Sequence, residues 1–328
     1  MNKKIALEEH FQLPSYQPDP VNLLGKITEQ SYIAELGRRL GDPIIRLAEM
    51  DQSGIELSVL SLTTPGIQGE IDPIQAVRRA RQMNDELFET FIRPYSNRFA
   101  GFAALPLQDP KAAVEEMTRV VRDMGFKGAM INGFSNNGGP EKGEYLDEEK
   151  VLPFWEAVAK LEVPVYIHPR MPLEGQRRIY DGYPVLMGSA WGFGVETATH
   201  ALRLILSGLF DRFPNIKIVL GHFGETLPYA ASRIDHRLQF HTRESRGKQK
   251  GKVIDYLRKN FYFTTSGFSH DQALMNAVSE IGTDHLLFSA DYPFEDLREA
   301  STWFDRSPLS ESDRQKIAYQ NAKALLKL

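Results

Sequence analysis

The 328-residue chain contains no cysteine, which excludes disulfide bonds, thiolate nucleophiles and thiolate metal sites together. Any metal ion must therefore be bound by histidine, aspartate and glutamate side chains. No apolar run reaches the roughly 18 residues that a membrane span needs. Residues 1–10 become acidic too soon for a signal peptide, so we expect a soluble cytoplasmic protein without a membrane partner.

An excess of charge of one sign is absent as well. The chain has 39 lysines and arginines against 43 aspartates and glutamates, a formal net charge of −4 at pH 7. This near-neutral balance argues against nucleic acid as the main partner. Hydrophobic residues make up 42% of the chain and charged residues 25%, which is enough for a large globular core.

Short apolar runs rich in β-branched residues alternate with amphipathic stretches, a pattern that predicts a parallel sheet. Eight such units at this length favour an α/β protein of the (β/α)8 TIM-barrel class. The alternative is an open doubly wound sheet, but no strand is followed by a Gly-x-Gly-x-x-Gly or Walker loop. No linker divides the chain, so we predict one barrel domain over residues 1–328.

The candidate elements follow from these patterns. Predicted strands cover residues 4–7, 57–62, 99–104, 128–131, 163–167, 216–220, 262–265 and 285–288. Predicted helices cover residues 44–52, 73–93, 111–124, 148–161, 197–209, 225–236, 272–281, 297–304 and 314–326. Stretches 12–42, 133–143 and 171–192 are predicted loop insertions after the C-terminal ends of strands, on the face where barrel active sites lie.

Ionisable side chains gather where several predicted strands end. They are Glu8 and His10 after the first strand, His168 after the fifth, His222 after the sixth and Asp291 after the eighth. Alternation along an extended chain points Glu8 and His10 to one side and Glu9 to the other. In a barrel these ends meet at one mouth, where imidazoles and carboxylates form a site suited to Zn²⁺, Mn²⁺ or Fe²⁺. The alternative is a polar plug of hydrogen-bonded side chains.

Local spacing separates the roles further. Asp291 could either bind a metal or transfer a proton, whereas the residues that emerge directly from strands one and five are natural ligands. His222 and Glu225 are three residues apart at the start of a predicted helix, so the carboxylate can orient the imidazole. Glu225 is also a first-turn acid favoured by the helix dipole, and the two roles are compatible.

Six segments carry a family resemblance: 6–11 (Ala-Leu-Glu-Glu-His-Phe), 104–110 (Ala-Leu-Pro-Leu-Gln-Asp-Pro), 168–170 (His-Pro-Arg), 221–225 (Gly-His-Phe-Gly-Glu), 264–267 (Thr-Thr-Ser-Gly) and 288–295 (Phe-Ser-Ala-Asp-Tyr-Pro-Phe-Glu). Together they resemble metal-dependent hydroxybenzoate decarboxylases of the amidohydrolase superfamily. The γ-resorcylate (2,6-dihydroxybenzoate) decarboxylases are nearest, with 2,3-dihydroxybenzoate and 5-carboxyvanillate decarboxylases nearby. The resemblance extends from about residue 4 to the C-terminus.

The resemblance implies roles for particular residues. One divalent ion, Mn²⁺ or Zn²⁺, would be bound without any organic cofactor by Glu8, His10, His168 and Asp291. The catalytic residues would be Asp291, His222 and Glu225, and the substrate-binding residues Asn132, Arg233 and Phe294. It also implies a homotetramer built as a dimer of dimers, in which Arg233 could act in its own site or in a neighbour's.

Two positions of the sequence differ from the pattern of the wider superfamily, and they help to choose between the possible functions. Hydrolases there usually begin with His-x-His, but Glu8 replaces the first histidine. Binuclear members often have a lysine where Asn132 stands. Both departures favour a single metal and weaken the hydrolase interpretation. The resemblance also implies a substrate-facing aromatic residue in the 12–42 loop, and we expect Leu23 or Leu24 to stand in its place.

The implied reaction is the reversible decarboxylation of an ortho-hydroxybenzoate, such as 2,6-dihydroxybenzoate, to resorcinol and CO₂ by a carbon–carbon lyase. Its hard step is protonation of the ring carbon that carries the carboxylate, because this breaks aromaticity. We expect Asp291 to deliver that proton, with a pKa raised by a second carboxylate and an apolar mouth, although metal ligation acts the other way. The alternatives are a 2,3-dihydroxybenzoate decarboxylase, a mononuclear metal hydrolase such as a lactonase, and a non-catalytic binding barrel.

Overall fold

The computed structural model describes residues 3–16 and 28–328. Within these residues, eight parallel strands alternate with helices, and each overlaps one of the predicted strands. They are β1 (Lys4–Phe11), β2 (Ile55–Leu62), β3 (Phe99–Gly101), β4 (Ala129–Asn132), β7 (Val165–His168), β8 (Ile218–Leu220), β9 (Phe261–Thr264) and β10 (Leu286–Leu287).

The strands close into a barrel. They pair in the orders β1-β2-β3 and β10-β9-β8-β7-β4, and single bridges join the two sheets at Ala103–Ala129 and Glu9–Tyr292. His10 N donates to the Tyr292 carbonyl at 2.7 Å across the second junction. The predicted α/β TIM barrel is therefore confirmed, and the carboxyl ends of its strands share one mouth.

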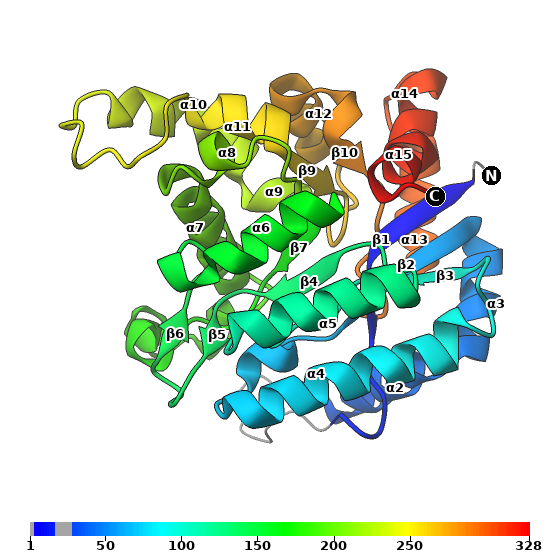
Figure 1. Cartoon of the computed structure of the whole chain (residues 1–328). Coiled ribbons are helices and arrows are strands. Elements are labelled where there is room, and N and C mark those ends of the chain that lie inside the picture. The colour runs from blue at the N-terminus through cyan, green and yellow to red at the C-terminus, as the bar shows by residue number, and fades with distance from the viewer. Residues whose placement is uncertain (1–2, 17–27) are drawn as a thin grey trace.

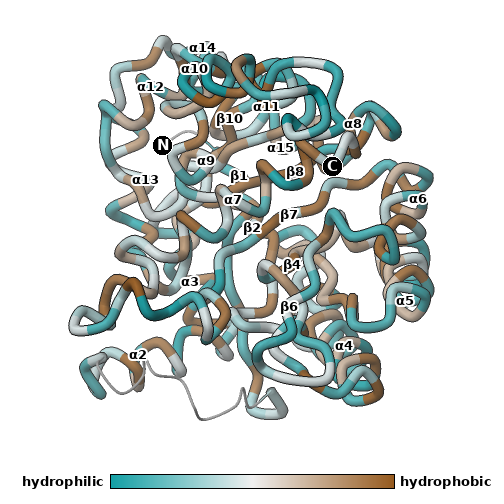
Figure 2. Tube along the Cα trace, turned by 90° about the vertical axis from the view of Figure 1, so that its left-hand side faces the viewer, coloured by the Kyte–Doolittle hydropathy of each residue, from teal (hydrophilic) through white to brown (hydrophobic). Residues whose placement is uncertain are grey.

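Helices cover the outside of the barrel (Figure 1), and the strands at its middle contain apolar segments (Figure 2). The longer helices are α3 (Pro43–Ser53), α4 (Pro73–Leu87), α5 (Pro110–Asp123), α6 (Leu152–Leu161), α7 (Gly192–Leu206), α10 (Leu227–Leu238), α11 (Val253–Asn260), α12 (Asp271–Ile281) and α13 (Leu297–Arg306). The chain ends in α14 (Glu311–Gln315), the π-helical turn η7 (Lys316–Gln320) and α15 (Asn321–Leu326). None of the helices in the described ranges combines the length and apolarity of a membrane span.

Aspartate followed by proline begins three of these helices. Asp42, Asp72 and Asp109 each accept a hydrogen bond from a backbone N–H of the first turn, and the next residue is proline. The carboxylates satisfy donors that a helix start leaves unpaired, and the fixed φ of proline suits the first helical position. These local signals explain why α3, α4 and α5 begin close to where the sequence predicted.

The predicted loop insertions contain regular structure. Stretch 12–42 includes α2 (Gln30–Gly41), which has no side-chain hydrogen bond at its start and so lacked the usual signal. Stretch 133–143 contains the antiparallel pair β5 (Ser135–Asn136) and β6 (Gly143–Glu144), and stretch 171–192 contains the 3₁₀ helices η4 (Glu174–Tyr180) and η5 (Pro184–Met187). Leu23 and Leu24, predicted to replace a substrate-facing aromatic residue, lie outside the described residues.

Candidate active site and metal centre

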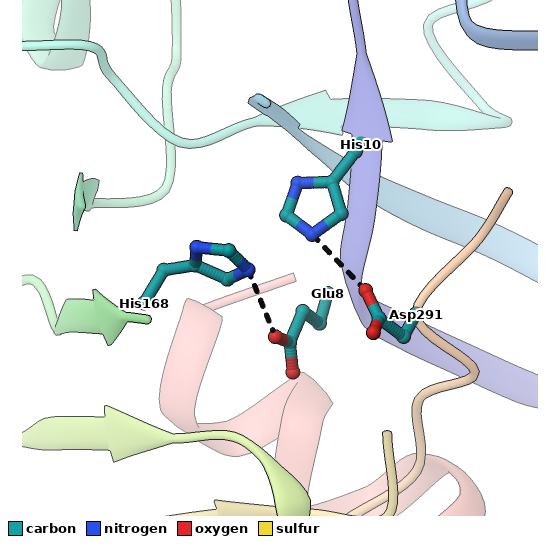
Figure 3. A group of neighbouring side chains, drawn as sticks. All are labelled: Glu8, His10, His168 and Asp291. Atoms are coloured by element: carbon teal, nitrogen blue, oxygen red, sulfur yellow. Dashed lines mark ion pairs between the residues drawn. The ribbon is translucent and has the colours of Figure 1, made fainter. Parts of the chain in front are cut away.

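Four side chains converge at the barrel mouth (Figure 3). Glu8 and His10 come from β1, His168 from the end of β7 and Asp291 from the chain after β10. One ligand atom from each lies within 4.8 Å of the others. His10 Nε2 is 3.2 Å from Asp291 Oδ1, and His168 Nε2 is 3.4 Å from Glu8 Oε1. The structure thus brings together the four residues that the resemblance assigns to a metal.

A local irregularity of β1 helps to place Glu8. Ala6 pairs with Ser58 and Glu9 pairs with Leu60, so β1 advances three residues where β2 advances two. Such a bulge re-aims side chains and is common beside active sites. Glu8 and His10 both join the cluster, while Glu9 accepts from Ser289 Oγ and Ala290 N, so the predicted sidedness of these three residues is confirmed.

The cluster has the properties of a metal site. Within the described residues, Glu8 Oε1, His10 Nε2 and Asp291 Oδ1 are buried without a hydrogen-bond partner. A polar plug does not account for three unsatisfied atoms that face one another, because burying such groups unpaired costs free energy. Burial also lowers the pKa of His168 well below its ordinary value, which keeps the imidazole in the neutral form that binds metals. Two imidazole nitrogens and two carboxylate oxygens fit Mn²⁺ or Zn²⁺.

Asn132 orients one of these ligands. Its Oδ1 lies 2.8 Å from His168 Nδ1, at the point where β4 and β7 pair. An amide oxygen there accepts the Nδ1 proton and leaves Nε2 of His168 free to face the cluster. The carbonyl of Asn132 is therefore engaged by His168, and the expected contact of this residue with substrate stays a prediction.

His222 and Glu225 form the predicted pair. His222 Nδ1 is 2.7 Å from Glu225 Oε1, while its Nε2 faces Asp291 Oδ2 at 3.6 Å and Glu8 Oε1 at 3.9 Å. Burial lowers the pKa of His222, but the negative charges of Glu225 and Glu8 raise it more, so the pKa ends well above its ordinary value.

The backbone around this pair differs from the predicted helix start. His222, Phe223 and Glu225 all have φ near +50°, in a short turn, α9 (His222–Glu225), that precedes α10. Glu225 is therefore not a first-turn acid of α10. Non-glycine residues at positive φ are strained, and such strain gathers at functional sites.

The pKa of Asp291 departs from the expectation. Burial raises the pKa of its carboxyl, but the imidazoles of His10 and His222, which face it at 3.2 Å and 3.6 Å, outweigh burial and hold the pKa below its ordinary value. A raised pKa was expected from a neighbouring carboxylate and an apolar mouth, but two imidazoles face Asp291 directly. Within the His222–Asp291 pair, the proton therefore resides on the imidazole.

The two other predicted substrate contacts lie in different places. Phe294 is at the mouth, where its ring meets that of His10 edge to face with 5.6 Å between centroids. Arg233 is exposed on α10, and within residues 3–16 and 28–328 none of its hydrogen bonds or ion pairs reaches the cluster. The structure thus places Phe294 beside the candidate site, and the substrate contact of Arg233 stays a prediction.

Sequence reasoning missed several hydroxyl groups around the ligands. Tyr166 OH and Ser266 Oγ both donate to Glu8 Oε2, and Thr264 Oγ1 lies 3.3 Å from the same oxygen. Tyr166 stands two residues before His168, so strand alternation could have placed both on one face. Thr264 and Ser266 fall in a motif that was noticed only as part of the family resemblance.

Arg46, on α3, contacts the backbone of the ligand residue His10. Its buried guanidinium lies 4.2 Å from the Tyr292 ring centroid and donates to the His10 carbonyl. Burial lowers the pKa of Arg46 to about 10. No sequence signal marked this residue, because it approaches the mouth from a helix 36 residues beyond His10.

Known proteins resemble this chain along its length. The sequence profile described as amidohydrolase matches residues 10–328. The γ-resorcylate decarboxylase of Rhizobium sp. (strain MTP-10005) is 48% identical over 330 residues, and that of Polaromonas sp. (strain JS666 / ATCC BAA-500) is 46% identical over 328 residues. Both alignments cover 100% of this chain and 99% of the relative.

Solved structures agree with this relationship. A 2,6-dihydroxybenzoate decarboxylase in complex with 2,6-dihydroxybenzoate superposes with a TM-score of 0.95 at 47% identity, covering 100% of both chains. A dihydroxybenzoic acid decarboxylase from Polaromonas sp. JS666, with bound manganese and the inhibitor 2-nitroresorcinol, has a TM-score of 0.95 at 46% identity, covering 100% of this chain and 98% of the other. The resemblance to hydroxybenzoate decarboxylases is confirmed, and the chain belongs to the amidohydrolase family.

Proposed function

We propose that the protein is a γ-resorcylate decarboxylase, a carbon–carbon lyase that reversibly converts 2,6-dihydroxybenzoate to resorcinol and CO₂. The observation that carries this proposal is the cluster of Glu8, His10, His168 and Asp291, three of which have a buried atom without a hydrogen-bond partner in the described residues, in a chain 46% and 48% identical to γ-resorcylate decarboxylases. These four residues would hold one divalent ion, and no organic cofactor is needed. Mn²⁺ is supported by the manganese bound in a relative, and Zn²⁺ by the ligand types.

An ion held by Glu8, His10, His168 and Asp291 would supply Lewis-acid charge next to an anionic substrate. The protein's own groups prepare the rest of the site. Asn132 fixes the ring of His168, and Phe294 offers an apolar wall beside His10 for the substrate ring. Holding the ring in one orientation removes rotational freedom before the chemical step.

Proton delivery is assigned to the His222–Asp291 pair. His222 Nε2 holds the proton, because Glu225 raises the pKa of the imidazole. Asp291 Oδ2, 3.6 Å away, accepts this proton and passes it to the ring carbon that carries the carboxylate. The bond between that carbon and the carboxylate then breaks, its electron pair restores aromaticity, and CO₂ leaves. Each turnover consumes one proton, which His222 recovers from solvent.

A homotetramer, built as a dimer of dimers, is part of the proposal. Large apolar side chains are exposed along residues 179–195 and on or near α10, and they include Ile179, Tyr183, Trp191, Tyr229 and Phe240. Exposed apolar surface of this extent marks interaction sites. Arg233 lies one helical turn after Tyr229 on α10, so a subunit that docks on this side of α10 would contact Arg233. Light scattering on the purified protein should give the mass of a tetramer, and a monomer mass would contradict this part.

A direct assay tests the activity. Protein loaded with Mn²⁺ or Zn²⁺ is incubated with 2,6-dihydroxybenzoate and, separately, with 2,3-dihydroxybenzoate, and resorcinol, catechol and CO₂ are measured. Release of resorcinol and CO₂ from the first substrate supports the proposal, whereas catechol alone would favour the 2,3-dihydroxybenzoate alternative. Lactone hydrolysis without CO₂ would indicate a hydrolase, an alternative that the decarboxylase relatives do not favour.

Two further expectations stay predictions of the sequence. One is a single domain over residues 1–328, which limited proteolysis would test by the size of the resistant fragment. The other is a cytoplasmic location, which cell fractionation would test. The small aromatic carboxylate remains the expected partner.

A further inference from the structure

The two oxygens of the Glu8 carboxylate have different surroundings. Oε1 lies 3.4 Å from His168 Nε2 and has no hydrogen-bond partner within the described residues. Oε2 accepts hydrogen bonds from Tyr166 OH and Ser266 Oγ. A Cβ at Gly221 would come within 2.6 Å of Oε2, so the backbone also closes on this oxygen. One oxygen is therefore enclosed by the protein while the other faces the cluster.

Thr264 joins the two donors. Its Oγ1 is 3.0 Å from Tyr166 OH and 2.7 Å from Ser266 Oγ, and only 3.3 Å from Glu8 Oε2. Each hydroxyl carries a single proton. If Tyr166 and Ser266 give theirs to Oε2, Thr264 gives its proton to one of these hydroxyl oxygens and fixes their positions. Ser266 Oγ also accepts from His222 N at 3.2 Å, which ties the network to the turn that carries His222.

We propose that Tyr166 and Ser266, linked by Thr264, are positioning residues that restrict Glu8 to a single donor oxygen, Oε1. This inference rests on the metal site proposed above. A carboxylate with two free oxygens can bind a cation through both, but the lone pairs of Oε2 are already used by O–H donors. Four protein groups that each donate one atom leave positions on the ion for the two oxygens of an ortho-hydroxybenzoate.

The hydroxyl groups can be removed without a large change in shape. The variants are Tyr166→Phe, Ser266→Ala and Thr264→Val, with Ser266→Thr as the conservative variant that keeps a hydroxyl. Tyr256→Phe is the matched control, because the Tyr256 hydroxyl also donates to a carboxylate, Asp211, at 2.8 Å, away from the mouth. Thermal unfolding first identifies the variants that fold like the wild type.

The main measurement is the visible spectrum of Co²⁺-loaded protein without substrate, because Co²⁺ absorption weakens as the coordination number rises. Tyr166→Phe and Ser266→Ala should weaken this absorption as Glu8 begins to donate both oxygens. Their kcat/KM should fall about 10- to 100-fold, the range for losing an outer hydrogen-bond partner of a ligand, mainly through a higher KM. Ser266→Thr should keep the stronger Co²⁺ absorption, and Tyr256→Phe should match the wild type in both measurements.

The outcomes separate this inference from the proposed function. Wild-type spectra in folded Tyr166→Phe and Ser266→Ala would overturn the inference and leave the metal site intact. If one of these two variants does not fold, the Co²⁺ spectra of the other and of Thr264→Val test the inference in its place. A wild type that binds Co²⁺ but decarboxylates nothing overturns the proposed function alone, and a wild type that binds no metal overturns both.

Discussion

The barrel mouth and the region where α7 packs on residues 145–147 both bury a histidine, but different groups surround it. His200, on α7, accepts from Leu146 N with Nε2 at 3.0 Å and packs edge to face on Tyr145. Burial lowers its pKa to about 3. Burial likewise lowers the pKa of His168 at the mouth. Both regions therefore contain a neutral, inaccessible imidazole.

The difference lies in the neighbouring donors. His200 Nδ1 is buried without a hydrogen-bond partner in the described part of the chain, and no carboxylate forms an ion pair with it there. At the mouth, His168 meets another imidazole and two carboxylates within 4.8 Å. An unsatisfied histidine atom alone is thus weak support for a metal site, whereas several unsatisfied donors that face one point are strong support. The comparison predicts that changes at the mouth alter activity and changes at His200 alter stability.

Removing the metal should have the largest effect. Dialysis against a chelator should abolish resorcinol release, because the two carboxylates would lose the cation that compensates their charge and the substrate would lose its Lewis acid. Added Mn²⁺ should restore activity. The measurement is metal content alongside turnover, with His200→Gln as a control that keeps both. Full turnover by metal-free protein would contradict the assignment of the mouth.

Asp291→Asn should lower kcat about 10²- to 10⁴-fold, the range for losing a positioned acid, because an amide cannot relay the proton. Metal content should stay near that of the wild type, since the amide oxygen of asparagine can still ligate. Asp296→Asn, in the same segment, is the matched control, because the Asp296 side chain caps α13 by accepting from Glu299 N. Wild-type turnover in Asp291→Asn would remove Asp291 from proton delivery.

Asn132→Ala should weaken metal binding about 10- to 100-fold, because His168 loses the acceptor that fixes its ring. Titration of apo-protein with Mn²⁺ measures this effect. Asn260→Ala is the control, since Asn260 is equally buried but donates to the Pro214 and Ile216 carbonyls. Equal metal affinity in both variants would argue against the orienting role of Asn132.

The smallest effect on activity is expected at His200, where the change should appear in stability instead. Its folded pKa of about 3 lies below the unfolded value near 6.5, so neutral His200 favours folding fully above pH 6.5. This contribution is lost as pH falls from 6.5 toward 3, by up to about 1.4 kcal/mol per pH unit. Denaturant unfolding at several pH values should show a shallower acid loss in His200→Gln. An identical pH dependence in both proteins would refute this assignment.

Much of the architecture could be predicted from the chain. Runs of β-branched residues and caps such as Asp109 are local signals, so the strands and most helices lie near their predicted positions. The helices α2 and α11 were missed, because α2 has no capping side chain and α11 follows a polar run of ten residues. Local sequence patterns do not predict helices whose stability depends on tertiary contacts.

The candidate site was predicted less completely. Glu8, His10, His168 and Asp291 could be found because each follows an apolar strand, and a barrel brings strand ends together. Arg46 could not be placed, since it reaches the mouth from a helix whose position no spacing reports. Ser266 follows the predicted strand 262–265, but nothing in the sequence showed that its hydroxyl contacts Glu8. Arg233 was expected to contact substrate, yet within its own chain it lies exposed on α10.

By itself, the sequence determined the class of fold and the chemistry of the donors. Without cysteine, a metal can be held only by nitrogen and oxygen atoms, and eight alternating units make a barrel whose strand ends share a mouth. Only the tertiary structure decided which Glu8 oxygen is enclosed, where the proton of the His222–Asp291 pair resides and how His168 is oriented. These properties depend on hydrogen bonds and charges a few ångströms apart, between residues that are up to 258 positions apart in the chain.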